Sequence, residues 1–269
     1  MQPTNAPSLN RLGAPQPFAI ARGRVQRGQR IGIYGTGGIG KTSEAALLGK
    51  GSIKPAFIDL ENGSHELDVA RVGGIDSWAR LGDALAQVSL WADYGAIVID
   101  SITKAEEWAV AETIATVPHE KPGRTIKRID DYGYGKGYQH VYETFLDLFD
   151  FLDVHVAAGR HIVLIAHDCT ASVPNPAGED FIQYQPRLQS PASGKASIRH
   201  HTKEWLDHLF FIGYDVVSKD GKAKGAGTRT IYPQERPTHW AKSRKLRDPI
   251  EYKDGGLELW TALFAKNGS

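Results

Sequence analysis

The sequence predicts an α/β protein with a doubly wound, mainly parallel sheet flanked by helices. Five short apolar runs, at 31–34, 56–60, 96–100, 162–166 and 208–214, alternate with longer segments of helical pattern. Each run is apolar along its whole length, as are strands that are buried on both faces. A glycine-rich segment directly after the first run adds the order strand, loop and helix. Such alternation is typical of a parallel sheet covered by helices.

Length and composition indicate one globular domain. The chain has 269 residues, which suffice for one substantial core with appendages, and its 41% hydrophobic and 23% charged residues are close to globular averages. A single cysteine, Cys169, excludes an internal disulfide framework and favours a reducing compartment. No apolar run approaches the ~20 residues of a membrane span. The net charge of +1 means that any binding of nucleic acid must depend on local clusters of cations.

The expected organisation is a single core at 18–265 between a flexible N-terminal arm at 1–17 and a short tail at 266–269. Segments 116–137 and 169–204 are rich in Gly, Pro and polar residues and are expected to be mobile loops within the core. The helical pattern at 138–156 places its apolar residues near one stripe, which favours a core-packing helix. Residues 18–21 read FAIA, which fits a first strand or the FxxA pattern by which some recombinases dock onto a neighbour.

A phosphate-binding loop follows the first apolar run. Residues 35–42 read GTGGIGKT and fit the pattern GxxxxGK[ST]. Glycines let successive N–H groups point at phosphate oxygens, and the following helix N-terminus adds partial positive charge. We expect Lys41 to bridge the β- and γ-phosphates of ATP and the Thr42 hydroxyl to ligate Mg²⁺. The expected nucleotide-binding residues are Gly35, Thr36, Gly37, Gly38, Ile39, Gly40, Lys41, Thr42 and Ser43.

Polar side chains end three further runs at the same edge of the predicted sheet. Asp100 ends the third run, where a Walker B aspartate orients Mg²⁺ or its water ligands. Asp59 and Glu61 end the second run and point the same way if the chain is extended. A carboxylate there positions the water that attacks the γ-phosphate, or else it is a helix N-cap or a surface acid. His167 follows the fourth run, where it can sense the γ-phosphate.

Taken together, the segments GTGGIGKT, FIDLEN, AIVIDS and IVLIAH resemble the RecA-like ATPase core. The likeness covers about residues 28–250 and is greatest to compact phage-type RecA-like proteins, including those classed as single-strand annealing proteins. This resemblance implies that Glu61 is the catalytic glutamate and Asp100 the Walker B aspartate. His167 departs from the glutamine at the sensor position of RecA. ATP and Mg²⁺ are the implied cofactors.

The resemblance also implies that a neighbouring subunit completes the site. Residues 240–244 read WAKSR and look like the Lys-x-Arg element of RadA-type members, whose cations reach the γ-phosphate of the next subunit. Alternate residues on an extended strand would aim Lys242 and Arg244 together, and such cations stabilise the charge that develops in phosphoryl transfer. The alternative is a solvated basic stretch at 242–247. The expected catalytic set is Lys41, Glu61, Asp100, His167, Lys242 and Arg244.

DNA-binding loops of RecA-like proteins follow the sensor strand, which corresponds to 169–204 here. Cations for phosphates and the aromatic residues Phe181 and Tyr184 for stacking suit single-stranded DNA, although a plain mobile loop is the alternative. Segment 124–138 has a similar composition and is expected to face DNA or a subunit. The DNA-binding candidates are Arg187, Lys195, Arg199, His200, His201 and Lys203.

The function expected from these motifs is hydrolysis of ATP, stimulated by single-stranded DNA, in recombination or annealing. Expected partners are single-stranded DNA, further copies of the chain in a ring or filament, and a single-strand-binding protein, with no membrane. The expected location is the cytoplasm, that of the host if the chain is phage-encoded. One alternative is an ATP-gated DNA-binding or annealing scaffold with little hydrolysis. Another is a small-molecule P-loop kinase, which would leave FIDLEN and Lys-x-Arg without a role.

Overall fold

The computed structural model describes residues 20, 22–23, 25–219 and 222–265. The expected N-terminal arm, three of the four residues at 18–21 and the expected tail lie outside the described residues. The helices and short 3₁₀ turns are α1 (Lys41–Leu47), η1 (Leu48–Lys50), α2 (Trp78–Ala86), η2 (Val88–Trp91), α3 (Ile102–Thr116), η3 (Ile129–Tyr132), α4 (Lys136–Ala157), α5 (Ile198–Trp205) and α6 (Glu258–Phe264).

Across the described residues, a nine-stranded sheet in the order β11-β9-β8-β1-β5-β4-β2-β3 forms the centre of the molecule, and β10 pairs with β8. The pairs from β8 through β1, β5, β4 and β2 to β3 are parallel, while β9, β10 and β11 are antiparallel additions. The strands are β1 (Arg30–Tyr34), β2 (Pro55–Asp59), β3 (Ala70–Arg71), β4 (Ala96–Asp100), β5 (His161–Ala166), β6 (Asp168–Val173), β7 (Phe181–Pro186), β8 (His208–Lys219), β9 (Lys222–Tyr232), β10 (Lys242–Ser243) and β11 (Ile250–Tyr252). All five predicted strands are therefore confirmed.

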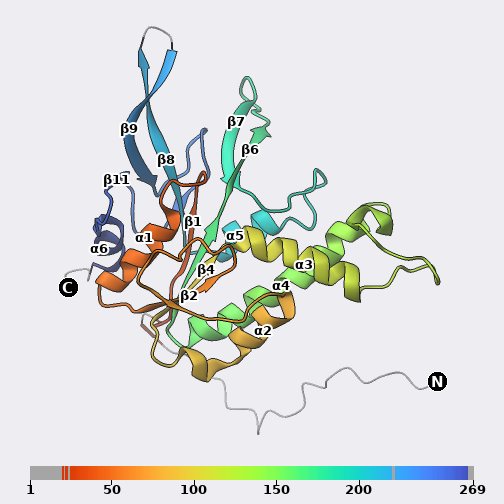
Figure 1. The fold of residues 1–269 in the computed structure, drawn as a ribbon. Coiled ribbons are helices and arrows are strands. Elements are labelled where there is room, and N and C mark those ends of the chain that lie inside the picture. The colour runs from red at the N-terminus through yellow and green to blue at the C-terminus, as the bar shows by residue number, and fades with distance from the viewer. Residues whose placement is uncertain (1–19, 21, 24, 220–221, 266–269) are drawn as a thin grey trace.

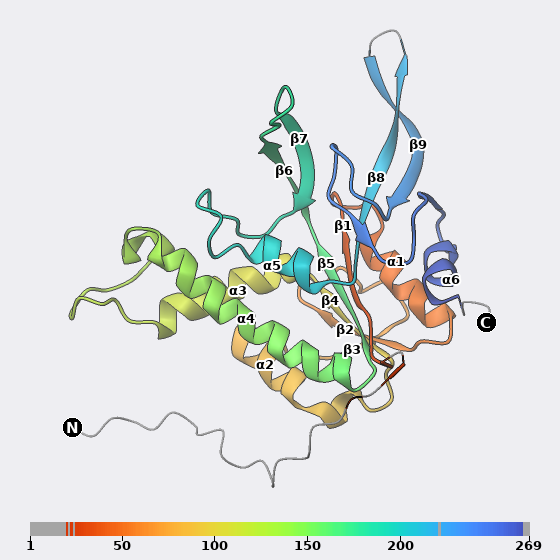
Figure 2. The same ribbon diagram turned by 180° about the vertical axis from the view of Figure 1, so that it is seen from behind.

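Two hydrophobic cores lie on the two faces of the sheet. Ile97 and Ile99 of β4 pack into the core shared with α2, α3, α4 and α5, whereas Ala96 and Val98 pack into the core shared with α1 and α6. This alternation follows from the period of two in a strand. In Figures 1 and 2, α1 and α6 lie on one side of the sheet and α2, α3 and α4 on the other. The predicted doubly wound α/β architecture is confirmed.

The carboxyl ends of four central strands meet at one edge. Tyr34 of β1 pairs with Ala166 of β5, and Asp100 of β4 pairs with both Ile165 and Asp59. The phosphate-binding loop and the predicted polar side chains follow these strand ends, so the topology brings them together. In open α/β sheets this edge is where ligands bind.

Two antiparallel hairpins rise beyond this edge, one formed by β6 and β7 and the other by β8 and β9 (Figures 1 and 2). The expectation of an irregular loop at 169–204 was therefore wrong, because that stretch contains β6, β7 and α5. Residues 182–185 alternate between exposed and buried positions, as expected of a strand, but Gly and Pro residues on both sides of the segment favour a loop in the sequence. Between the end of α3 at Thr116 and the start of α4 at Lys136, segment 116–137 contains η3 as its only regular element.

The predicted helix at 138–156 is confirmed as α4, which buries its apolar stripe against the sheet and α3. None of the helices in the described ranges combines the length and apolarity that crossing a bilayer requires.

Candidate functional site

The phosphate-binding loop joins β1 to α1, and its lysine is held over it. Lys41 Nζ donates hydrogen bonds to the carbonyl oxygens of Gly35 at 2.8 Å and Thr36 at 2.9 Å. Burial lowers the pKa of this ammonium group. An ammonium group has three donors, so one is left for a phosphate oxygen. The predicted role of Lys41 thus fits the geometry of the loop.

Two side chains from the antiparallel part of the sheet donate hydrogen bonds to carbonyl oxygens of the phosphate-binding loop. Arg229 of β9 donates to the carbonyl of Ile39 at 2.9 Å, and the Tyr252 hydroxyl of β11 donates to the carbonyl of Gly40 at 3.1 Å. The Arg229 guanidinium also lies 4.1 Å from the centre of the Tyr252 ring. A side chain at Gly40, where φ is +104°, would collide with the Tyr252 hydroxyl. Sequence reasoning missed this clamp, because neither residue belongs to a recognisable pattern.

Thr42 and Asp100 form the predicted metal-binding pair. The Thr42 hydroxyl donates to Asp100 Oδ2 at 2.6 Å, and Asp100 is only 6% exposed. Burial raises the pKa of Asp100, although the bond from Thr42 opposes the shift. A buried carboxylate without a cation is destabilised, so a divalent cation would compensate it.

The donor chemistry of this pair fits Mg²⁺. A hydroxyl and a carboxylate supply the oxygen ligands that Mg²⁺ prefers, and Mg²⁺ usually keeps several waters beside substrate phosphates. Over the described ranges, no group of three or more His, Cys, Asp or Glu side chains could hold a metal ion by itself. Phosphate oxygens and water would therefore supply most of the ligands.

Glu61 lies in a three-residue cluster at the end of β4 and β5. The Ser101 hydroxyl donates to Glu61 Oε1, and His167 Nε2 lies 2.9 Å from Glu61 Oε2. Burial alone would raise the pKa of Glu61, but the hydrogen bonds from Ser101 and His167 lower it below its ordinary value. Glu61 is therefore ionised at neutral pH and can accept a proton. Sequence reasoning missed Ser101, although its place directly after the Walker B aspartate was visible.

Asp59 and Glu61 do not point the same way, so that expectation was wrong. Asp59 ends β2, and its carboxylate turns back to accept hydrogen bonds from the backbone N–H groups of Glu61, Gly63 and Ser64 at 2.8–3.2 Å. Arg71 reinforces the same loop, donating from Nε to Ser64 Oγ at 2.8 Å. Asp59 thus shapes the segment that presents Glu61, because the chain leaves the extended conformation directly after the strand.

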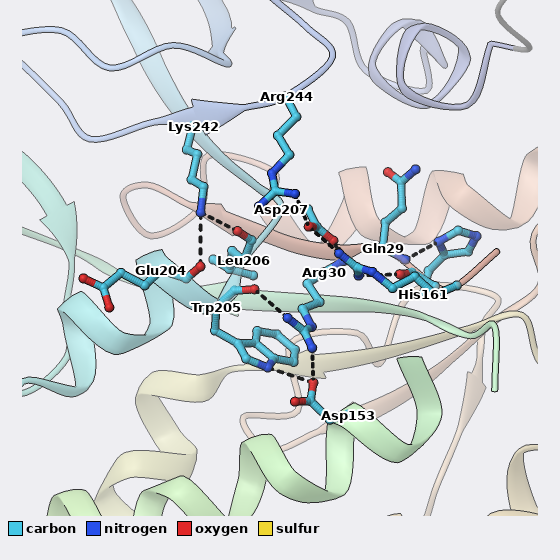
Figure 3. A network of polar contacts seen from close by, with 12 residues as sticks. Gln29, Arg30, Asp153, His161, Glu204, Trp205, Leu206, Asp207, Lys242 and Arg244 are labelled. Atoms are coloured by element: carbon cyan, nitrogen blue, oxygen red, sulfur yellow. Dashed lines mark hydrogen bonds and ion pairs between the residues drawn. The ribbon is translucent and has the colours of Figure 1, made fainter. Parts of the chain in front are cut away.

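Lys242 and Arg244 leave β10 on the same side of the chain, as predicted, but they bind different partners (Figure 3). Lys242 Nζ donates to the carbonyls of Lys203, Glu204 and Leu206 at 2.6–3.2 Å, which satisfies the C-terminus of α5. Arg244 is 69% exposed and lies 3.8 Å from Asp207. A cation at the C-terminal end of a helix satisfies its last carbonyls.

The two cations lie away from their own phosphate-binding loop. Lys242 and Ser243 pair with Leu209 and His208 at the amino end of β8, whereas the loop follows the carboxyl end of β1, which runs parallel to β8. Any role of Arg244 in phosphate chemistry must therefore be played at a neighbouring copy.

Replacing Lys242 with methionine is expected to lower the free energy of unfolding by about 1–3 kcal/mol, because it leaves three carbonyls of the α5 terminus without their charged donor. Arg244→Met should change it by less than about 0.5 kcal/mol, because Arg27 already pairs with Asp207 through two hydrogen bonds. Urea unfolding of the two variants measures both values. Equal stabilities would contradict the capping role of Lys242.

Four of the six DNA-binding candidates lie on α5 and make contacts within the chain. Arg199 donates to the Leu188 carbonyl and to Gln185, and Lys203 pairs with Glu235 at 2.6 Å. The rings of His200 and His201 pack against Trp240, and against Tyr142 and Phe149, respectively. The expectation that these cations belong to an open loop was wrong, because a helix N-capped by Ser197 orders them. Arg187 and Lys195 are exposed, and their contact with DNA stays a prediction.

Three comparisons relate the chain to known proteins. A family model described as AAA domain (AAA_24) matches residues 27–245. No curated protein matches the chain in sequence. Among solved structures, the chain is similar to the KaiC-like protein PH0186 from the hyperthermophilic archaeon Pyrococcus horikoshii OT3, with 13% sequence identity, a TM-score of 0.45, and coverage of 84% of this chain and 86% of that chain.

The family match runs from β1 and the phosphate-binding loop to β10, which carries Lys242, while Tyr252 of β11 lies outside it. P-loop proteins of this kind bind a nucleoside triphosphate, usually with Mg²⁺. The chain therefore belongs to the AAA domain family AAA_24 and is a P-loop ATPase.

Proposed function

We propose that this ATPase acts on single-stranded DNA in recombination or annealing and that DNA stimulates its hydrolysis of ATP. The observation that carries the proposal is the position of His167. Its imidazole contacts Glu61, and the next residue, Asp168, begins the β6–β7 hairpin. A ligand that binds the hairpin and shifts it would therefore shift His167 and, through it, the Glu61 carboxylate.

Within the site, the residues of the chain divide the work. Bound Mg²⁺ would neutralise phosphate charge, with Thr42 and Asp100 holding it. Lys41 would bind phosphate oxygens at the mouth of the loop. Glu61, kept ionised by Ser101 and His167, would position a water molecule and accept its proton.

A cavity beside α1 could accept the base of the nucleotide. This cavity of about 640 Å³ is lined by Ser43, Ala46 and Leu47 of α1 on one side and by Leu67 and Asp68 on the other. Ser43 follows Lys41 and Thr42 directly, so a nucleotide with its phosphates at the loop can extend along this helix. The size lies within the usual range of ligand pockets.

A neighbouring copy would supply the remaining cation. Arg244 is largely exposed and lies at the end of the sheet away from its own loop, so it is available to the next subunit in a ring or filament. An arginine delivered in this way makes hydrolysis depend on assembly. The Arg244→Met variant, which should fold with near-normal stability, is expected to bind ATP but hydrolyse it slowly.

The DNA hypothesis predicts that single-stranded DNA raises the steady-state rate of ATP hydrolysis and that the DNA concentration needed rises steeply with salt. Contacts with phosphates release counterions, so binding weakens as the salt concentration increases. The measurement is phosphate release titrated with an oligothymidylate at two salt concentrations, with duplex DNA as the control. A rate that is independent of DNA at both salt concentrations would refute the proposed function.

A further inference from the structure

A second cavity, of about 750 Å³, lies between the two hairpins and reaches the phosphate-binding loop. Its loop end is lined by Thr36 and Ile39, and its walls come from β7, β8, β9 and the segment after β9. The nucleotide site described above uses neither these walls nor the aromatic side chains on them. Those that matter here are Tyr184, Phe211, Tyr214, Tyr232, Arg236 and His239, which we call the aromatic cleft.

Three rings of the aromatic cleft are stacked on Phe211. The ring of Tyr184 is 5.3 Å from that of Phe211 at an interplanar angle of 18°. His239 and Tyr232 lie on the same ring at 4.9 Å and 6.1 Å, with angles of 22° and 23°. Rings from β7, from β9 and from the segment after β9 therefore lie nearly parallel to Phe211 of β8. Together they form a layered surface of the kind on which a planar ligand stacks.

The outer rings of the cleft are exposed, and the backbone that carries one of them is held by hydrogen bonds. Tyr184 and Tyr214 are 43% and 52% exposed. The backbone of Tyr184 is fixed by hydrogen bonds with Thr238 and Trp240, each at 2.9 Å. A rigid aromatic side chain loses little entropy when a ligand binds, so the cleft is preorganised.

The lining of the cleft includes one cation and one carboxylate. The guanidinium of Arg236 is exposed and lies 5.6 Å from the centre of the Tyr232 ring. Asp168 lines the cleft as well, and a carboxylate repels phosphate. A ligand with flat apolar groups and phosphates would therefore place its rings on the tyrosines and a phosphate at Arg236.

We infer that the aromatic cleft seats unstacked bases of single-stranded DNA, with Arg236 on the backbone phosphate. Exposed aromatic rings beside an arginine bind single strands without sequence preference, because every base has a flat face. This inference rests on the proposed function and moves the principal DNA contacts from the α5 cations to the two hairpins.

The cleft is also joined to the phosphate-binding loop. The Tyr34 hydroxyl donates to the carbonyl of Trp240 at 2.6 Å and lies 3.0 Å from the carbonyl oxygen of Tyr184, and Tyr34 directly precedes Gly35. Bases held against Tyr184 would therefore favour one arrangement of the loop. Coupling of this kind is reciprocal, so bound ATP should strengthen binding of DNA by the factor with which DNA strengthens binding of ATP.

The test is binding of a fluorescein-labelled oligothymidylate, followed by anisotropy, to wild type and to Tyr184→Ala and Tyr214→Ala. Each variant should bind about 10-fold or more weakly, and Tyr184→Trp should restore binding. Val154→Ala is the control, because Val154 is an apolar side chain 53% exposed on α4, outside every segment proposed to contact DNA. Photocrosslinking with 5-iododeoxyuridine should label Tyr184 or Tyr214, which a purely structural role would not produce.

The outcomes separate the two proposals. Wild type that does not bind the oligonucleotide overturns the DNA function and the cleft together. If wild type binds the oligonucleotide and both alanine variants bind it equally well, the proposed role of the cleft is wrong while the DNA function stands. Crosslinks confined to α5 would lead to the same conclusion. Binding of a fluorescent ATP analogue in the absence of DNA tests whether the cleft holds the base of ATP instead. If the alanine variants lose affinity for the nucleotide in that assay, the cleft holds the base of ATP and the inference is wrong.

Discussion

Replacing Glu61 with glutamine is expected to lower the rate of ATP hydrolysis by about 10²- to 10⁴-fold, the usual contribution of a general base. The amide keeps the size of the side chain and can still accept a hydrogen bond from Ser101, but it cannot take a proton from water. Affinity for ATP should stay the same or rise slightly, because a negative charge near the phosphates is removed. Single-turnover phosphate release and equilibrium binding of a fluorescent ATP analogue measure the two effects separately.

The matched control for this variant is Glu66→Gln, five positions further along the same segment. Glu66 is 87% exposed, so its replacement should leave hydrolysis unchanged. Hydrolysis by Glu61→Gln at the wild-type rate would remove the catalytic assignment. Equally slow hydrolysis by wild type and variant would favour the ATP-gated scaffold over the ATPase cycle.

Glu44 should make the stability of the protein fall as pH rises. This glutamate of α1 is 2% exposed, and its Oε1 atom has no hydrogen-bond partner among the described residues. Burial, with a smaller contribution from the charge of Glu258, raises the pKa of Glu44 from 4.5 to about 8. At neutral pH the folded protein therefore keeps this carboxyl protonated.

The sign of the effect follows from the two pKa values. Below about pH 4.5 the carboxyl is protonated in both the folded and the unfolded chain, and its full contribution to stability is present. Between pH 4.5 and about 8 the unfolded chain has lost the proton while the folded chain keeps it, so stability falls with rising pH. The total loss is on the order of 5 kcal/mol.

Glu44→Gln should remove this slope, because the amide does not titrate. Urea unfolding from pH 5 to about 9 should show the variant gaining stability relative to wild type by about 1 kcal/mol per pH unit. A difference in the free energy of unfolding that is the same at every pH reflects the hydrogen-bond donors of the new amide rather than titration. Glu143→Gln, at an exposed position of α4, is the control and should run parallel to wild type. Parallel curves for Glu44→Gln would show that Glu44 is ionised in the folded protein.

The sequence alone determined the fold class, the phosphate-binding loop and the Walker B aspartate. These features are local. A loop that wraps phosphate needs glycines, a lysine and a hydroxyl within eight consecutive residues, and a buried parallel strand needs an unbroken apolar run. Glu61 and His167 were also found, because each follows such a strand and parallel strands end at one edge.

Only the tertiary structure decided how these side chains are used. It placed Ser101 and His167 on Glu61, turned Asp59 away, and made Lys242 a cap for α5. It also brought Arg229 and Tyr252 to the loop from 190 and 212 positions away. The aromatic cleft depends in the same way on two hairpins whose register sets which rings meet. Such contacts join residues far apart in the chain, and their geometry follows from the pairing of strands rather than from any local pattern.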